Sequence, residues 1–182
     1  MTAQPPQSSS GAAQTLPVEA YTAWHLRVFA WLLDYLPFAL LIGIGWGVLA
    51  ATRETACVAD ISEYQLGEFC STGPSTVGEV SALAVFPALA FGYLFWNLGY
   101  RQGSTGCSIG KSILRFRLIS EKDGQSIGFG MSLLREVIYL VLNAVCGLLW
   151  LVAVLFPLWD AKRQTLVDKI VSTLCIPLPN TY

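Results

Sequence analysis

The sequence predicts an all-α integral membrane protein: two transmembrane helices, a third helical segment that is re-entrant or spanning, and a small cytoplasmic β-hairpin. Apolar residues make up 54% of the 182 residues and charged residues only 13%, against about a quarter in soluble domains. Three apolar runs stand at 28–51, 80–99 and 137–158. Each is long enough to cross a bilayer core, which takes about 20 helical residues. Lys and Arg gather in one of the two loops between these runs.

Residues 1–21 have almost no charge, no apolar periodicity and several Pro, Ser and Gln. Such a segment buries too little surface to offset its ordering entropy, so we predict a disordered tail, with a docking peptide as the alternative. It also lacks the basic n-region of a cleaved signal peptide. Residues 22–176 are predicted to form one membrane domain, and 177–182 a C-terminal tail.

The first run is uncharged except for Asp34. A carboxylate at the centre of a membrane helix costs about 2.5–3.5 kcal/mol on insertion scales, so it is expected to face an internal partner, a cavity or a transport path. Arg27 lies about two helical turns earlier on the same face, and Pro37 frees the backbone carbonyl of Leu33 beside Asp34. Two interpretations stay open: Asp34 accepts hydrogen bonds from Arg27 or an Asn and locks helices together, or it lies on an ion or proton path.

The other polar groups expected inside the membrane are Asn97 and Asn143, and helix packing suffices to explain both. Gly43 and Gly47 have the small-xxx-small spacing that lets helices approach closely. Gly45 lies on a different face, where we expect it to add flexibility rather than contact.

Charge predicts the orientation. The loop 53–79 carries one basic residue and five acids, whereas the loop 100–136 carries six Lys and Arg. Because Lys and Arg stay on the cytoplasmic side, the loop 53–79 is predicted outside, and the loop 100–136 and the N-terminus inside. Cys57 and Cys70 both lie in the outer loop, where an oxidising compartment favours a disulfide over two free thiols.

The third run, 137–158, conflicts with this orientation if it crosses the membrane once. A single crossing would place three basic residues of the tail outside: Lys162, Arg163 and Lys169. Asn143 and Gly147 interrupt the run and Pro157 ends it, so we favour a re-entrant segment that turns near Cys146–Gly147. Such segments require other parts of the protein to cover the exposed backbone.

The stretch 106–112 (GCSIGKS) is similar to a phosphate-binding loop but has three residues between its glycines where that motif needs four. Residues 112–120 alternate apolar and polar side chains in the strand period, a turn follows at 122–124, and 125–127 could return. These patterns predict a cytoplasmic β-hairpin and no nucleotide. Three basic residues are expected to face lipid headgroups or another protein: Lys111, Arg115 and Arg117.

Together these residues resemble the RDD family of small membrane proteins, named for an arginine at the start of the first membrane helix and two aspartates. Arg27 and Asp34 match the first two, and the stretch 163–169 (RQTLVDK) is similar to the closing motif, with Asp168 as the second aspartate. The stretch 106–111 and the residues 128–130 (GFG) resemble the middle section. The resemblance implies a bacterial inner-membrane protein of a family suspected of transport. Asn143 departs from the family pattern, because some members have a carboxylate at this position.

The predicted function is a transporter-like membrane protein that acts as a homo-oligomer, and the alternative is an accessory or scaffold subunit that binds other membrane proteins. The lipid bilayer is the expected surrounding, and no nucleic acid or cofactor is predicted. A metal site is not predicted either, since His25 is the only histidine and no CxxC occurs. No catalytic set emerges, so an enzyme is not expected. If the tail is cytoplasmic, Arg27 can reach the carboxylate of Asp34, Asp160 or Asp168. We then expect these residues and Arg163 to form one charged cluster.

Overall fold

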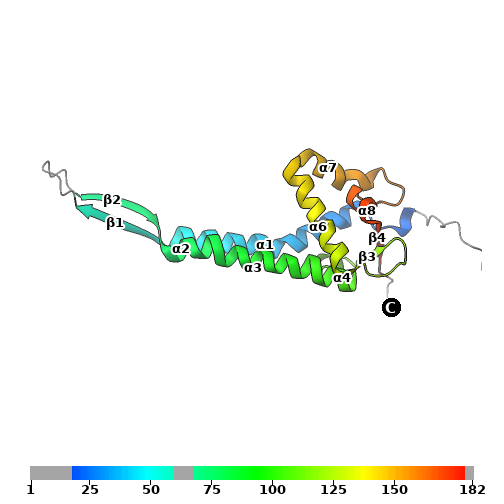
Figure 1. Cartoon of the computed structure of the whole chain (residues 1–182), viewed down its shortest axis with the longest axis horizontal. Coiled ribbons are helices and arrows are strands. Elements are labelled where there is room, and N and C mark those ends of the chain that lie inside the picture. The colour runs from blue at the N-terminus through cyan, green and yellow to red at the C-terminus, as the bar shows by residue number, and fades with distance from the viewer. Residues whose placement is uncertain (1–17, 60–67, 179–182) are drawn as a thin grey trace, which may run out of the picture.

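The computed structural model describes residues 18–59 and 68–178. Figure 1 shows two long helices side by side, with a β-hairpin at one end and a compact unit at the other. We call α1 (Trp24–Ala51) and the helical stretch Thr76–Thr105 the helix pair, the β-hairpin the arm, and residues 106–178 the platform. Most of the tail predicted at 1–21 lies outside the described residues.

Three helices are long and apolar enough to cross a membrane: Trp24–Ala51, Thr76–Thr105 and Gly128–Val145. They confirm the mostly helical membrane class. The second runs without a break through α2 (Thr76–Val80), α3 (Phe86–Leu94) and α4 (Gln102–Thr105), which are joined by π-helical turns at Ser81–Val85 and Phe95–Arg101. With 28 residues, α1 is about 42 Å long, so its ends extend beyond a hydrocarbon core of about 30 Å.

The glycine of α1 that lies at the contact with the facing helix is not one of the two predicted. Gly45 is buried, and a Cβ added there would lie 3.0 Å from the Cβ of Phe86 on the facing helix. A Cβ added at Gly43 or Gly47 would meet nothing within 4 Å. The prediction for these glycines was therefore wrong, because the rotation of α1 about its axis turns the Gly45 face, and not the Gly43–Gly47 face, toward α3.

The arm consists of β1 (Arg53–Ala59) and β2 (Glu68–Pro74), which pair antiparallel directly beyond the helix pair (Figure 1). Cys57 and Cys70 stand opposite each other in this register and form a disulfide. The predicted disulfide is confirmed. Beside α2, a Cβ at Gly78 would lie 2.5 Å from the Thr52 hydroxyl, so the two ends of the helix pair meet closely where the arm begins.

The platform contains a second two-stranded sheet, and it is not the predicted hairpin. β3 (Phe116–Ser120) pairs antiparallel with β4 (Thr173–Pro177) from the C-terminal segment, with Leu118 opposite Cys175. The residues predicted to return, 125–127, form no strand. They are too few to cover the buried face of β3 before the chain turns into α6 at Gly128, whose φ is 78°. The first two residues of the predicted strand 112–120 instead end α5 (Ile109–Ile113), a helix that Ser108 caps through its side chain.

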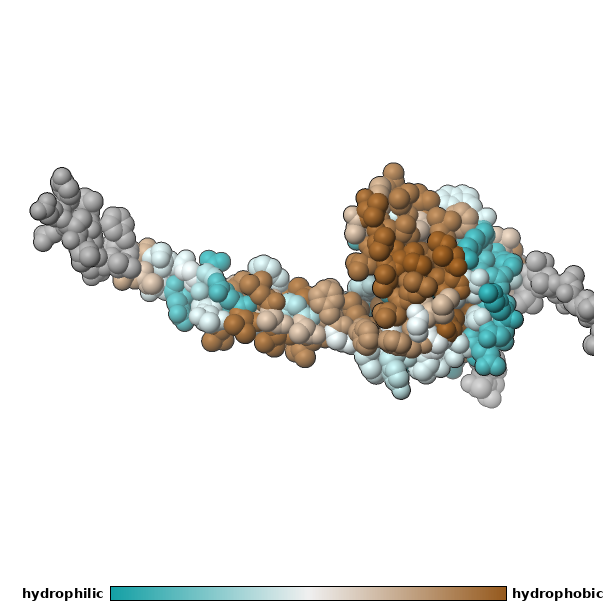
Figure 2. Space-filling model, in the orientation of Figure 1, coloured by the Kyte–Doolittle hydropathy of each residue, from teal (hydrophilic) through white to brown (hydrophobic). Residues whose placement is uncertain are grey.

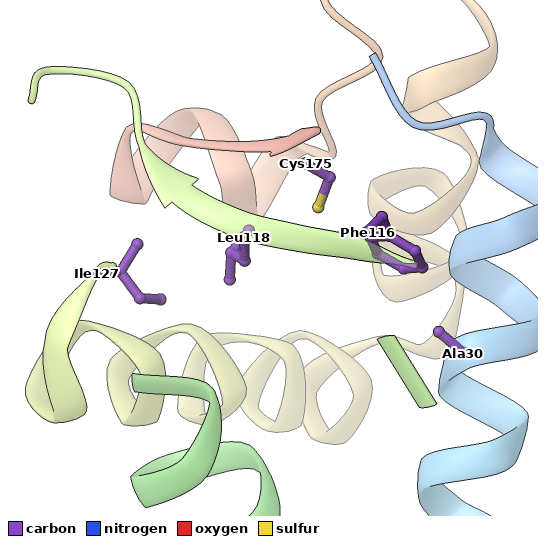
Figure 3. Close-up of a cluster of buried hydrophobic side chains, with 5 residues drawn as sticks. All are labelled: Ala30, Phe116, Leu118, Ile127 and Cys175. Atoms are coloured by element: carbon purple, nitrogen blue, oxygen red, sulfur yellow. The ribbon is translucent and has the colours of Figure 1, made fainter. Parts of the chain in front are cut away.

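One apolar core joins the platform to the start of α1. Figure 3 shows Phe116 and Leu118 on β3 together with side chains from α1, β4 and the entrance to α6. The five members are Ala30, Phe116, Leu118, Ile127 and Cys175. The backbone N–H of Thr22, just before α1, donates to the carbonyl of Cys175 at 3.0 Å. Both terminal segments of the described chain therefore lie at the same end of the helix pair.

The third apolar run is divided by a turn. α6 (Gly128–Val145) and α7 (Gly147–Leu155) meet at Cys146, whose backbone is extended, and a short 3-10 turn (Phe156–Leu158) follows α7. The chain then comes back to α1, where the indole N–H of Trp24 donates to the carbonyl of Val154 at 2.9 Å. α6 begins at Gly128, well before the predicted start at residue 137, because residues 128–136 and the first part of the apolar run form one helix.

Candidate functional site

The carboxylate of Asp34 binds three groups from two other elements. Its Oδ1 accepts hydrogen bonds from Asn97 Nδ2 at 2.8 Å and from the backbone N–H of Gly110 at 2.7 Å, and its Oδ2 accepts one from the Ser108 hydroxyl. Only 2% of Asp34 is exposed, and Asn97 is fully buried. The burial of this carboxylate is therefore offset by hydrogen bonds from the same chain.

Local structure explains why these partners meet. Asn97 lies on the second π-helical turn, and its Oδ1 also accepts the backbone N–H of Ile109 at 2.9 Å. Ser108 and Gly110 belong to the first turn of α5, whose free N–H groups favour a negative charge. The stretch that is similar to a phosphate-binding loop thus binds a carboxylate of its own chain. Asp34 and Asn97 together hold α5 against the helix pair.

The carboxylate of Asp168 on α8 (Leu166–Val171) binds two arginines. Arg27 Nη1 lies 2.7 Å from its Oδ2, and Arg135 Nε from α6 lies 2.9 Å from its Oδ1. The same carboxylate accepts the backbone N–H of Thr165, in a capping box at the start of α8, and the hydroxyl of Thr173. Burial by itself would raise the pKa of Asp168, but Arg135 and Arg27 hold this pKa well below its usual range.

The signature residues occupy two sites instead of one cluster. Arg27 bonds to Asp168 and not to Asp34, whose hydrogen-bond partners all come from Asn97 and the start of α5. Asp160 instead pairs with Lys169 at 2.6 Å. Arg163 donates to the carbonyl of Tyr21 at 3.3 Å. The predicted contact between Arg27 and Asp168 is present. The expectation of one cluster containing all of these residues was wrong, because Arg27 and Asp34 lie about 10 Å apart along α1 and therefore meet different elements.

Residues 21–172 match the RDD family. The chain belongs to the RDD family. Two proteins named "Proline-rich antigen homolog", from two strains of Mycobacterium tuberculosis, are 49% identical over 168 residues, which cover 92% of this chain and 68% of each relative. The "Proline-rich antigen" of Mycobacterium leprae is 46% identical over 167 residues, covering 92% of this chain and 65% of that protein. No solved structure matches the chain.

Two residues of this RDD family chain have roles that sequence reasoning missed. Arg135 counts in the sequence only as one of the six basic residues of the loop 100–136, yet it binds Asp168 and also Glu136 at 3.1 Å. Lys111 was expected at the surface, but it is buried and donates to Gln102, whose amide donates to Ser132 at 2.9 Å. Burial lowers the pKa of Lys111. The available signal for Arg135 was its place one turn from Ser132 on the polar face of an amphipathic helix.

Asn143 is exposed on α6, whereas Arg115 and Arg117 are exposed on the platform. Within residues 18–59 and 68–178, no group of three or more His, Cys, Asp or Glu residues could hold a metal ion. The buried polar groups described above bind one another instead: two carboxylates accept from arginines, an amide, hydroxyls and backbone N–H groups, and Lys111 donates to Gln102.

Proposed function

We propose that this RDD family membrane protein is a non-enzymatic accessory or scaffold subunit of a larger membrane complex in the cell envelope. The observation that carries the proposal is that both oxygens of each buried signature carboxylate accept hydrogen bonds from groups of the same chain. Asp34 accepts three hydrogen bonds and Asp168 accepts four. A carboxylate on a transport path must exchange partners with a moving ion or proton, whereas these two hold helices together.

The surfaces of the chain also support a role in assembly. Figure 2 shows hydrophobic side chains along the helix pair and over α6 and α7, where lipid or the helices of another protein would cover them. Leu83 and Phe91, for example, are 71% and 62% exposed. The arm at one end and the platform at the other offer two further surfaces, and exposed Arg115 and Arg117 make the platform surface basic.

We infer further that the platform is cytoplasmic and that α6 and α7 form a re-entrant segment. β3 precedes α6, β4 follows α8, and the two strands pair, so both lie on one side of the membrane. The segment between them therefore cannot cross once. Ten of the 11 Lys and Arg residues lie in or beside the platform, and the other, Arg53, lies at the arm. The positive-inside rule then favours a cytoplasmic platform and an arm outside.

Two variants, each with one introduced exposed cysteine, test this orientation. Ala161→Cys on the platform and Glu79→Cys near the arm both replace exposed residues, each in a background with Cys146→Ser. We expect an impermeant maleimide to label Glu79→Cys in intact cells and Ala161→Cys only after lysis. Labelling of Ala161→Cys from outside would contradict the re-entrant segment.

The accessory role is tested by purification from native membranes in a mild detergent. We expect other membrane proteins to co-purify in stoichiometric amounts. Arg115→Gln combined with Arg117→Gln should reduce their yield if they bind the platform, and Arg53→Gln should do so if they bind the arm. Recovery of this chain alone, as a monomer or a homo-oligomer, would contradict the proposal.

The second candidate is a transporter-like homo-oligomer, and the open face at Gly43 and Gly47 favours it. Nothing within 4 Å would meet a Cβ added at either glycine, so a second copy could approach α1 closely there. This candidate requires a homo-oligomer in detergent and a transport activity that Asp34→Asn abolishes at unchanged abundance. If the protein has the accessory role, we expect Asp34→Asn to lower its thermal stability or its abundance in the membrane instead.

A further inference from the structure

We propose that a groove between the start of α1 and the 3-10 turn that follows α7 binds the phosphate of an anionic phospholipid from the surrounding leaflet. The groove has a volume of about 290 Å³ and lies on the side of the platform next to α1. Six residues line it: Ala23, Trp24, His25, Pro157, Leu158 and Arg163. The hydrogen bond from the Trp24 indole to the Val154 carbonyl holds its two walls together.

The groove lies at the depth of the lipid headgroups. Because α1 is about 42 Å long and the hydrocarbon core about 30 Å thick, the first turn of α1 extends into the headgroup region. Tryptophan is enriched at this depth in membrane proteins. Leu158 and Trp159 are 55% and 74% exposed beside the groove, so an acyl chain attached to the bound phosphate would meet apolar side chains.

Arg163 is held at the groove by a built turn. The Oδ2 of Asp160 accepts the backbone N–H groups of Lys162 at 3.1 Å and Gln164 at 2.9 Å. Within this turn Arg163 has a φ of 49°, a conformation that is uncommon for residues other than glycine. Its Nη1 donates to the carbonyl of Tyr21, which places the guanidinium beside the entrance to α1.

The charges around the groove favour an anion. The carboxylates of the adjacent segments are already occupied: Asp160 pairs with Lys169, Glu121 with Lys162 at 2.5 Å, and Asp168 with Arg27 and Arg135. Within the described part of the chain, Arg163 has no ion-pair partner, and none of the six lining residues is acidic. α1 also begins without a capping side chain or an acid in its first turn, so its positive dipole end is not compensated there. A guanidinium is well suited to a phosphate.

The test is native mass spectrometry of the detergent-purified chain with dioleoyl-phosphatidylglycerol and, separately, dioleoyl-phosphatidylcholine. We expect the phosphatidylglycerol to bind preferentially and Arg163→Gln to weaken it about fivefold, the effect of one basic residue near a membrane surface. Leu158→Glu should weaken it similarly, because it adds a negative charge at an exposed lining position without altering the bonds of Arg163. The matched control is Lys122→Gln, which removes an exposed charge outside the groove and should leave binding unchanged.

Three results would overturn the proposal. Equal losses in Arg163→Gln and Lys122→Gln would indicate general surface charge. Equal binding of the two lipids would remove the role of the anionic headgroup, and displacement by millimolar inorganic phosphate would indicate a site for the free anion. Lipid binding does not depend on the accessory role, since a transporter would meet the same leaflet.

Discussion

Asp168→Asn is expected to destabilise the protein by about 3–5 kcal/mol, the range for removing one partner of a buried ion pair. The substitution leaves Arg27 without its anion and leaves Arg135 with Glu136 alone. The new amide also directs a donor toward one of the two guanidinium groups. Thermal unfolding in detergent and protein abundance in membranes both measure the loss.

The matched control for Asp168→Asn is Glu121→Gln. Glu121 pairs with Lys162, but these side chains are 31% and 35% exposed, and exposed pairs contribute about 0–1 kcal/mol. We expect the melting temperature of Glu121→Gln to stay near that of the unsubstituted protein. Equal shifts in the two variants would show that burial adds nothing to the Asp168 pairs.

Acid should act through the same residue. Since Arg135 and Arg27 depress the pKa of Asp168 in the folded state relative to about 3.9 when unfolded, its contribution is complete above the unfolded value and is lost as the pH falls below it. We therefore expect the unsubstituted protein to lose more stability than Asp168→Asn when acidified from about pH 5 to about pH 3.

Gly110→Ala is expected to destabilise the protein by about 3 kcal/mol or more, at the upper end for overpacking, because backbone and not side chain is in the way. A Cβ at Gly110 would lie 2.2 Å from the carbonyl oxygen of Ala30 and 2.9 Å from its carbon. α5 must then move away from α1, which also breaks the 2.7 Å bond from the Gly110 N–H to Asp34. Thermal unfolding and limited proteolysis of the platform measure the effect.

Gly43→Ala is the control for this clash. It makes the same chemical change inside a helix, but its Cβ would meet nothing within 4 Å, and alanine is favoured over glycine in helices. We expect its melting temperature to be unchanged or slightly higher. A loss as large as that of Gly110→Ala would mean that helix backbone effects, and not the contact with Ala30, decide both results.

The sequence by itself determined the membrane class, because the length and hydropathy of a helix are local properties. It also singled out Cys57 and Cys70 as a pair, since charge placed both in one loop, and the disulfide between them is present. Arg27, Asp34 and Asp168, together with the middle stretches 106–111 and 128–130, indicated the RDD family, to which the chain belongs.

The tertiary structure alone decided which distant groups meet. The alternation in 112–120 predicted a strand but could not specify its partner, because strand pairing is non-local and β4 lies beyond α6, α7 and α8. For the same reason Asp34 binds Asn97 and α5 rather than Arg27, and Arg135 joins Asp168. Periodicity shows that a helix has faces, whereas the rotation of each packed helix determines which face meets which neighbour.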